Sequence, residues 1–159
     1  MTSSLALVVA IVGTGAVTFA LAQSSAPIPG PGSSAAEIVK ARQHSLKVLG
    51  AAFKTIRDEL NGASPDAVKI RKAAADIAQA AEAIDKWFPA GTGPQDGVKT
   101  DARSEVWTDA AGFTATRTKF EREAHKLSNG SDVSAWRGAA SSLGQTCRDC
   151  HEKYRVKRE

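Results

Sequence analysis

Apolar residues recur at helical spacing in four separate stretches of the chain. In the first stretch they follow Ser34 in steps built from three and four residues, and the pattern stops at Asn61-Gly62: Ile38, Leu46, Leu49, Phe53, Ile56 and Leu60. Ser34 followed three residues later by Glu37 has the spacing of a capping box, in which each residue's side chain accepts the backbone N–H of the other. The sequence therefore predicts a long first helix that begins after Ser34.

The second stretch is expected to begin at Ser64-Pro65 and to continue as far as Phe88, because Pro89 cannot extend a helix. Its apolar positions step by three and four residues: Ile70, Ala74, Ile77, Ala81, Ile84 and Phe88. Residues 89–101 then form the longest irregular connection within the region of the four helices.

Two further stretches complete the pattern. The third is predicted to end at Asn129-Gly130 and carries Val106, Ala110, Phe113, Arg117, Phe120, Ala124 and Leu127. The fourth carries Val133, Trp136, Ala140, Leu143, Cys147, Cys150 and Tyr154. Four amphipathic helices with short first and third connections pack most simply as an antiparallel bundle, so the predicted fold class is an all-α four-helix bundle. A chain of 159 residues supports one such domain.

The first twenty-two residues have a different character, because they contain no charged side chain and a long apolar run that ends in Ala20-Leu21-Ala22. This pattern predicts a secretory signal peptide over residues 1–22, cleaved so that the mature chain begins at Gln23. The alternative is an uncleaved membrane anchor, since the usual Lys or Arg near the start is missing and the run approaches the ~20 residues of a spanning helix. Either interpretation exports the globular part.

Residues 23–33 hold three prolines and two glycines, which indicates a flexible leader ahead of a bundle domain over residues 34–159. The net charge of +4 belongs entirely to the exported part. Part of it gathers at Lys153, Arg155, Lys157 and Arg158, either as a solvated helix end that complements the helix dipole or as a docking site for a partner. We expect no nucleic-acid partner and, after cleavage, no membrane association.

The stretch CRDCH, residues 147–151, contains the only two cysteines of the chain. On a helix Cys147, Cys150 and His151 are offset by three and four residues, so both sulfurs and the imidazole face one side. This arrangement fits a haem bound covalently through thioether bonds to both cysteines, with the histidine as the iron ligand. The predicted cofactor is one haem c per chain, attached at Cys147 and Cys150 and ligated by His151.

Two other chemistries use the same residue types. A zinc site would need more ligands, and His44 and His125 supply no second closely spaced pair. A dithiol redox centre usually lies at a helix N-terminus, where the dipole lowers the thiol pKa, whereas this pair lies near a helix C-terminus. Covalent haem is therefore the favoured interpretation.

The other face of the iron has no evident protein ligand. The only methionine is Met1, which should leave with the signal peptide. His44 lies away from the apolar face of its helix, and His125 lies at the edge of one, as surface or boundary histidines do. We therefore expect a five-coordinate iron whose distal face is closed by hydrocarbon.

The four predicted helices and the attachment motif at the end of the last one resemble the cytochrome c′ family. Its members are four-helix bundles with this motif at the end of the last helix. The similarity extends from about Ser34 to Lys157. It is carried by four segments: VKARQHSL (39–46), KWFPAGTGP (86–94), DARSEVWTDAAGF (101–113) and CRDCHEKYR (147–155). Ser104, where the family commonly has proline, and His125, where an apolar residue is usual, depart from the pattern.

The resemblance implies roles for several further residues. Leu46 corresponds to the apolar distal residue, and Arg42 corresponds to an arginine near the haem propionates. Gln43 falls at a haem-edge position, Asp101 occupies a haem-contact region, and Arg155 corresponds to an arginine over the exposed proximal imidazole. The i to i+4 spacing of His151 and Arg155 permits that last contact.

The resemblance also implies high-spin haem that binds NO and CO reversibly, with a role in NO binding or detoxification in the bacterial periplasm. Leu46 offers no hydrogen-bond donor that would stabilise bound O₂, which favours NO and CO. An electron-transfer cytochrome is the alternative, since basic residues near the haem edge could steer an acidic redox partner. An enzyme, such as a peroxidase or NO-consuming catalyst, is least favoured because the expected pocket has no acid/base group. Many family members are homodimers through the first two helices, and the alanine-rich second helix permits either a dimer or a monomer.

Overall fold

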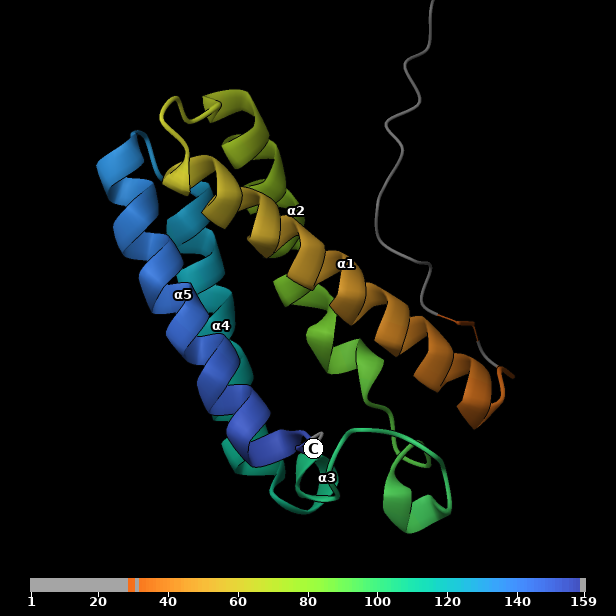
Figure 1. The fold of residues 1–159 in the computed structure, drawn as a ribbon. Helices are drawn as coiled ribbons and strands as arrows, with labels where there is room; N and C mark the ends of the chain where they lie inside the picture. Colours follow the sequence, from red (N-terminus) through yellow and green to blue (C-terminus); the bar gives the residue numbers. More distant parts are fainter. Residues whose placement is uncertain (1–28, 31, 158–159) are drawn as a thin grey trace, which may run out of the picture.

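The computed structural model describes residues 29–30 and 32–157, so the predicted signal peptide and most of the leader lie outside the described residues. The described chain forms the predicted antiparallel bundle, with long helices that alternate in direction (Figure 1). These are α1 (Ala35–Asn61), α2 (Ala67–Ala83), α4 (Ala110–Ser128) and α5 (Val133–Tyr154). The short helix α3 (Glu105–Thr108) and the 3-10 turns η1 (Ile84–Trp87) and η2 (Pro94–Asp96) lie in the long connection between α2 and α4.

The predicted capping box at the start of α1 is confirmed. The backbone N–H of Glu37 donates to Ser34 Oγ at 3.3 Å, and the backbone N–H of Ser34 donates to Glu37 Oε2 at 2.8 Å. At the other end, the N–H of Gly62 donates to the carbonyls of Asp58 and Glu59, so the helix ends where the pattern stops. Both ends of α1 are thus specified by local sequence.

The predicted limits of α2 were wrong at both ends. The helix begins after Asp66 rather than at Ser64-Pro65, because Asp66 Oδ1 accepts the N–H groups of Val68 at 2.9 Å and Lys69 at 3.2 Å. It ends at Ala83, and the last turn before Pro89 tightens into the 3-10 turn η1 instead of continuing to Phe88 as α-helix.

The third predicted helix is broken at Asp109, whose backbone (φ −113°, ψ 56°) is not helical. Its side chain accepts the N–H of Gly112 at 3.2 Å and so starts α4 as a cap. A short acidic side chain that bonds its own following backbone competes with a continuous helix. Val106 therefore belongs to the separate helix α3, whereas the rest of the predicted apolar stripe lies on α4.

The core lies where α2 packs against α1 and α4, and α4 against α5. The apolar residues of α2 that were read from the sequence pattern are fully buried: Ile70, Ala74, Ile77 and Ala81. Alanine at two of these positions allows the helix axes to approach closely. By contrast, α1 and α5 contact each other over a shorter stretch and diverge toward the N-terminus of α1 (Figure 1). None of the helices in residues 29–30 and 32–157 combines the length and hydropathy that crossing a membrane requires.

Candidate haem site

The last turns of α5 carry the attachment motif. Cys147, Cys150 and His151 all lie within the helix, so the predicted common face of the two sulfurs and the imidazole exists in the structure. Both cysteines are half-buried free thiols, and His151 is exposed. Within the described residues, no cluster of three or more His, Cys, Asp or Glu side chains is arranged to hold a metal ion.

The ionisation of these side chains argues against dithiol redox chemistry and is compatible with iron ligation by His151. Burial raises the pKa of Cys147. The pKa of Cys150 is raised to about 11, mainly by burial and to a smaller extent by the neighbouring Cys147. The thiols are therefore protonated at neutral pH and lack the reactive thiolate of a redox pair. The pKa of His151 is lowered, mainly by desolvation of the imidazole and to a smaller extent by the positive charge of Arg155. This favours the neutral imidazole that metals bind.

A short backbone pairing fixes the segment directly after His151. The N–H of Arg103 donates to the carbonyl of Tyr154, and the N–H of Val156 donates to the carbonyl of Asp101, both at 2.9 Å. Ala102 and Arg155 form the antiparallel bridge between these two bonds. We call this pairing of residues 101–103 with 154–156 the terminal clamp. It holds Arg155 beside His151, and it uses Asp101 through its backbone carbonyl.

An open hollow of about 350 Å³ lies next to the imidazole of His151, lined also by Glu152, Arg155, Val156 and Lys157. Arg155 and Lys157 are exposed. The side of the motif that faces this hollow is therefore accessible to small molecules and positively charged.

Asp109 anchors the end of α5 from the other side. Its Oδ2 atom accepts the Tyr154 hydroxyl at 3.0 Å and lies 2.6 Å from Lys153 Nζ. Tyr154 is buried and packs edge-to-face on Phe113, with 5.2 Å between ring centroids, and Phe113 packs in the same way on Phe88. These contacts join the last turn of α5 to the α2–α3 connection.

Arg42 of α1 is a buried cation, 3% exposed. Its Nη1 donates to the carbonyl of Trp87 and to Thr92 Oγ1, and its Nη2 donates to the carbonyl of Thr92 and to Thr100 Oγ1, at 2.8–3.3 Å. The guanidinium also lies 4.7 Å from the ring centroid of Phe88. Burial lowers the pKa of Arg42 to about 10, so it stays charged at neutral pH. Sequence reasoning missed Thr92 and Thr100, and the only signal was the segment KWFPAGTGP that contains the first of them.

The register between α1 and α5 places Leu46 at the level of His151. A Cβ atom on Gly144 would stand 3.4 Å from Cζ of Phe53, so α1 and α5 meet at these two positions. The two helices run in opposite directions. A step of seven residues toward the N-terminus of α1 from Phe53 and a step of seven residues toward the C-terminus of α5 from Gly144 therefore both cover about 10 Å along the bundle in the same direction. Those steps end at Leu46 and His151.

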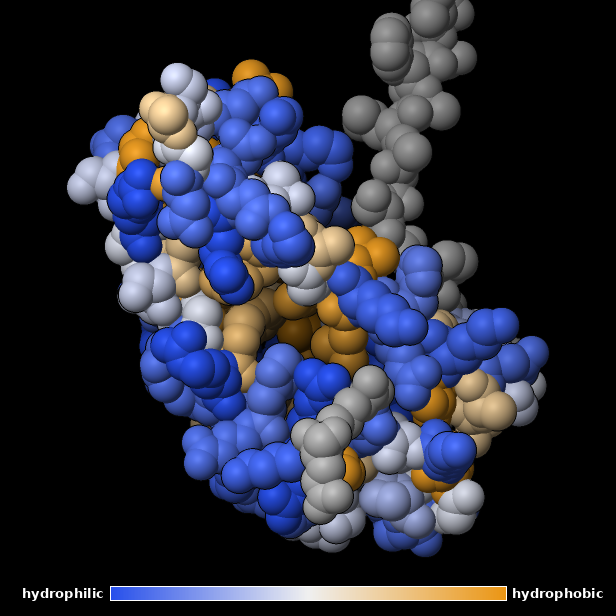
Figure 2. Space-filling model, viewed as in Figure 1, coloured by the Kyte–Doolittle hydropathy of each residue, from blue (hydrophilic) through white to orange (hydrophobic). Residues whose placement is uncertain are grey.

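Leu46 is 40% exposed, although it is a large apolar residue. Near this level the two helices diverge, and Figure 2 shows a hollow with an apolar floor between them. A partly exposed leucine on α1 and two half-buried thiols and an exposed imidazole on α5 fit a planar apolar macrocycle attached to α5.

The other predicted residues are placed as follows. Gln43 and His44 are exposed on α1, Gln43 one turn before Leu46. His125 Nε2 lies 3.4 Å from Glu82 Oε1, so this imidazole faces α2 from α4, with a 43% exposed side chain. Neither histidine is brought to the face of α5 that carries the motif.

A four-helix bundle with C-x-x-C-H at the end of its last helix and an apolar hollow before it defines a c-type haem protein. The family model for cytochrome c′ matches residues 37–155, and the chain belongs to the cytochrome c′ family. Its cofactor is covalent haem c. The cytochrome c′ of Alcaligenes xylosoxydans xylosoxydans is 32% identical over 126 residues, which cover 77% of this chain and 95% of the relative. That of Pararhodospirillum photometricum is 32% identical over 121 residues, covering 74% and 94%.

Solved structures share the fold. The cytochrome c′ of Thermochromatium tepidum superposes with a TM-score of 0.72 at 24% identity, covering 79% of this chain and 98% of that one. A cytochrome c′ with ligand-controlled dimer dissociation also gives 0.72, at 27% identity and 79% and 99% coverage. A ferrous variant of cytochrome c prime from Alcaligenes xylosoxidans with bound NO gives 0.71, at 28% identity and 79% and 98% coverage.

Proposed function

We propose that this protein is a periplasmic haem protein with a five-coordinate, high-spin iron that binds NO and CO, and that its role is NO binding or detoxification. Cys147 and Cys150 hold the haem, and His151 binds its iron. Haem iron, when bound in this way, supplies one open coordination position at which a diatomic gas is held. Leu46 covers that coordination position without being a ligand of the iron.

The observation that carries the proposal is the placement of Leu46 on α1 at the level of His151 on α5, with 40% of this apolar residue exposed. An aliphatic side chain cannot bind iron, and it brings no hydrogen-bond donor toward a bound gas. O₂ gains most from such a donor, so a leucine at this place favours NO and CO. Solved structures of two variants of one relative, the cytochrome c prime of Alcaligenes xylosoxidans at 28% identity, are complexes with NO, which supports the same ligand here.

The remaining site residues complete the proposal. Arg42 and Gln43 lie on the side of Leu46 toward the start of α1, where the resemblance assigns them to the haem propionates and the haem edge. Asp101 and Arg155 belong to the terminal clamp, which positions Arg155 beside the imidazole. A gas arriving from the His151 side would enter the 350 Å³ hollow that Arg155 lines.

Export is part of the proposal. Residues 1–22 would direct the chain across the membrane and be cleaved before Gln23, and residues 23–33 would form a leader ahead of the domain at 34–159. A homodimer through α1 and α2 is the assembly to test, since a relative 27% identical shows ligand-controlled dimer dissociation.

An electron-transfer cytochrome is the second candidate. It is favoured by exposed Arg155 and Lys157 beside His151, which suit an acidic redox partner. An enzymatic role has no comparable support, because peroxide cleavage needs an acid/base group where Leu46 lies. Peroxide turnover at enzyme-like rates would reverse that ranking.

The test is the absorption spectrum of the exported, haem-loaded protein in the ferrous state, before and after CO and then NO. A high-spin spectrum that shifts with both gases supports an open iron position. A low-spin spectrum that is indifferent to CO would mean that a protein group closes the position, and would replace the proposal with the electron-transfer alternative.

A further inference from the structure

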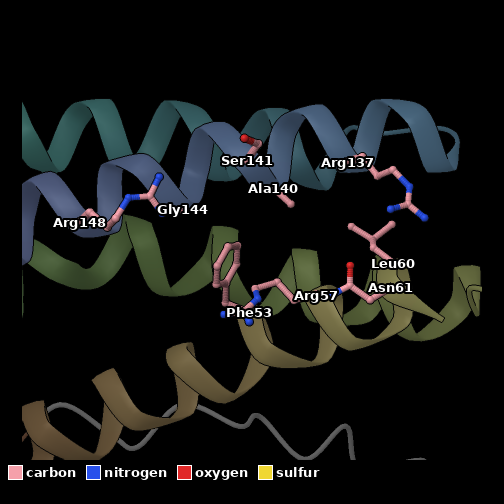
Figure 3. Close-up of a pocket in the computed structure, with 9 residues that line it drawn as sticks. All are labelled: Phe53, Arg57, Leu60, Asn61, Arg137, Ala140, Ser141, Gly144 and Arg148. Atoms are coloured by element: carbon pink, nitrogen blue, oxygen red, sulfur yellow. The ribbon is translucent and has the colours of Figure 1, made fainter.

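A second groove lies between α1 and α5, lined by residues from Phe53 to Asn61 on α1 and from Arg137 to Arg148 on α5 (Figure 3). Its volume is about 550 Å³, and its floor is apolar, formed by Phe53 and Leu60 from α1 and by Ala140 and Gly144 from α5. Gly144 has no side chain to fill this space, so Phe53 Cζ and Arg148 Nη1 come within 3.4 and 3.8 Å of the place a Cβ would take. The groove is large enough to receive several side chains of a bound molecule.

The charged residues that line the groove are all arginines: Arg57 from α1 and Arg137 and Arg148 from α5. Among the described residues neither Arg57 nor Arg137 has a hydrogen-bond or ion-pair partner, and Arg148 donates only to the neutral Gln145 Oε1, at 2.6 and 3.2 Å. The groove therefore carries three positive charges and no lining carboxylate.

Carboxylates next to these arginines in the sequence are engaged elsewhere. Asp58 pairs with Lys54 at 2.5 Å, and Asp149 pairs with Lys119 of α4 at 2.9 Å. Like charges gathered around a low-polarity floor repel each other, so an anionic occupant would stabilise the arrangement.

The spacing of the arginines excludes a small anion as the full occupant. Arg137 and Arg148 are eleven residues apart on α5, which places their Cα atoms about 16 Å apart. Figure 3 shows Arg137 near the Leu60 end of the groove and Arg148 beside Gly144. An occupant that uses both must be elongated, with acidic groups near its ends and apolar groups between them. Apolar floors with aromatic and arginine side chains are also the usual composition of protein-binding hot spots.

We propose that this groove docks an acidic helix of a partner protein, with acidic side chains on Arg57, Arg137 and Arg148 and apolar side chains on Phe53 and Ala140. Arg148 lies between Cys147 and Cys150, so the docked partner would lie beside the haem. Only the position of the docked partner beside the haem depends on the proposed haem attachment. Binding of the acidic helix in the groove does not require that the iron binds a gas.

The probe is a fluorescein-labelled helical peptide of about 18 residues, with glutamates eleven positions apart and leucines on the same face between them. Binding to the haem-loaded protein is measured by fluorescence anisotropy at low and moderate salt. A peptide with glutamine in place of glutamate is the peptide control. We expect the glutamate peptide to bind and its affinity to fall with salt.

The triple variant Arg57→Gln, Arg137→Gln and Arg148→Gln should bind the peptide at least about tenfold more weakly, since three exposed charge pairs are removed. The matched variant Lys40→Gln, Lys47→Gln and Lys86→Gln loses the same charge outside the groove and should bind nearly as the wild type. Ser141→Trp fills the groove without changing charge and should also weaken binding. Unfolding in urea checks that each variant is folded.

Equal weakening by the two triple variants would mean non-specific attraction and would overturn the proposal. No binding of the glutamate peptide at about 1 mM would overturn it as well. If dodecyl phosphate displaces the peptide and binds more tightly, the groove is a site for a small amphiphilic anion instead. CO and NO spectra recorded on the same samples test the proposed function separately.

Discussion

Arg42 shows how one residue organises the connection that closes one end of the bundle. Its guanidinium donates to four oxygen atoms of residues 87–100 and lies against Phe88. A charge this deeply buried would be costly without such partners. The resemblance to cytochrome c′ points to the propionates, whereas the structure adds a role in holding the connection in place.

Replacing Arg42 with Met should lower the free energy of unfolding by about 2–4 kcal/mol, because buried acceptors on Trp87 and Thr92 and a half-buried one on Thr100 lose their donor. Arg42→Lys should recover little of this, since one ammonium cannot reproduce the planar fork. Urea unfolding followed by circular dichroism measures the effect. Lys40→Met, two residues away and exposed, should change stability by less than about 0.5 kcal/mol, and a similar loss there would contradict the account.

Leu46 is the residue on which gas access depends in the proposed function. Leu46→Ala removes most of the side chain over the open iron position, so the association rates of CO and NO should rise severalfold. Flash photolysis of the CO complex and stopped-flow mixing with NO measure these rates. Val68→Ala, a change at a remote residue that is 72% exposed, is the matched control. Unchanged rates in Leu46→Ala would show that another group limits access.

The break at Asp109 divides the third predicted helix and ties α4 to the end of α5. Lys153 first, then Tyr154 and the N–H of Gly112, lower the pKa of the Asp109 carboxyl. The stabilisation that the Asp109 carboxylate gives the folded protein is therefore complete above the ordinary pKa of aspartate, ~3.9. It is lost as the pH falls through the lower pKa that Asp109 has in the folded protein.

Asp109→Asn should remove this pH dependence. The wild type should lose more stability than the variant when the pH falls from about 7 to about 3, across the ordinary aspartate pKa. Thermal unfolding at a series of pH values measures the difference. Asp85→Asn, at an exposed carboxylate in η1, should leave the wild-type profile unchanged, and a parallel pair of curves for wild type and Asp109→Asn would argue against the contact with α5.

The limits of sequence reasoning are clearest for these elements. Helical periodicity and the Ser34 cap predicted α1, and the offset of Cys147, Cys150 and His151 predicted a common face. Asp109 starts α4 by a local cap on Gly112, but its contact with Tyr154 spans 45 residues, and the contacts that bury Arg42 reach Thr92 and Thr100, 50 and 58 residues away. Such distant contacts leave no mark in a local pattern of apolar positions.

For the whole molecule, attachment of the haem and export make one joint prediction. The exported protein should have an intact mass corresponding to a chain that begins at Gln23 with one haem added, and acidified organic solvent should not extract the haem. The double variant Cys147→Ala and Cys150→Ala should release its haem to that solvent. A wild-type mass that still includes residues 1–22 would instead support the retained anchor.

The terminal clamp also affects how the molecule opens. The last turn of a helix ordinarily frays, so that its amide hydrogens exchange with water even while the rest of the protein stays folded. Here the backbone of Tyr154 and Val156 is tied to residues 101–103, and the Tyr154 side chain is tied to Asp109. The turn that carries His151, the proposed iron ligand, should therefore open only together with the start of α3 and α4. Its backbone amides should exchange as slowly as those of the bundle interior, although the turn lies at the end of a helix.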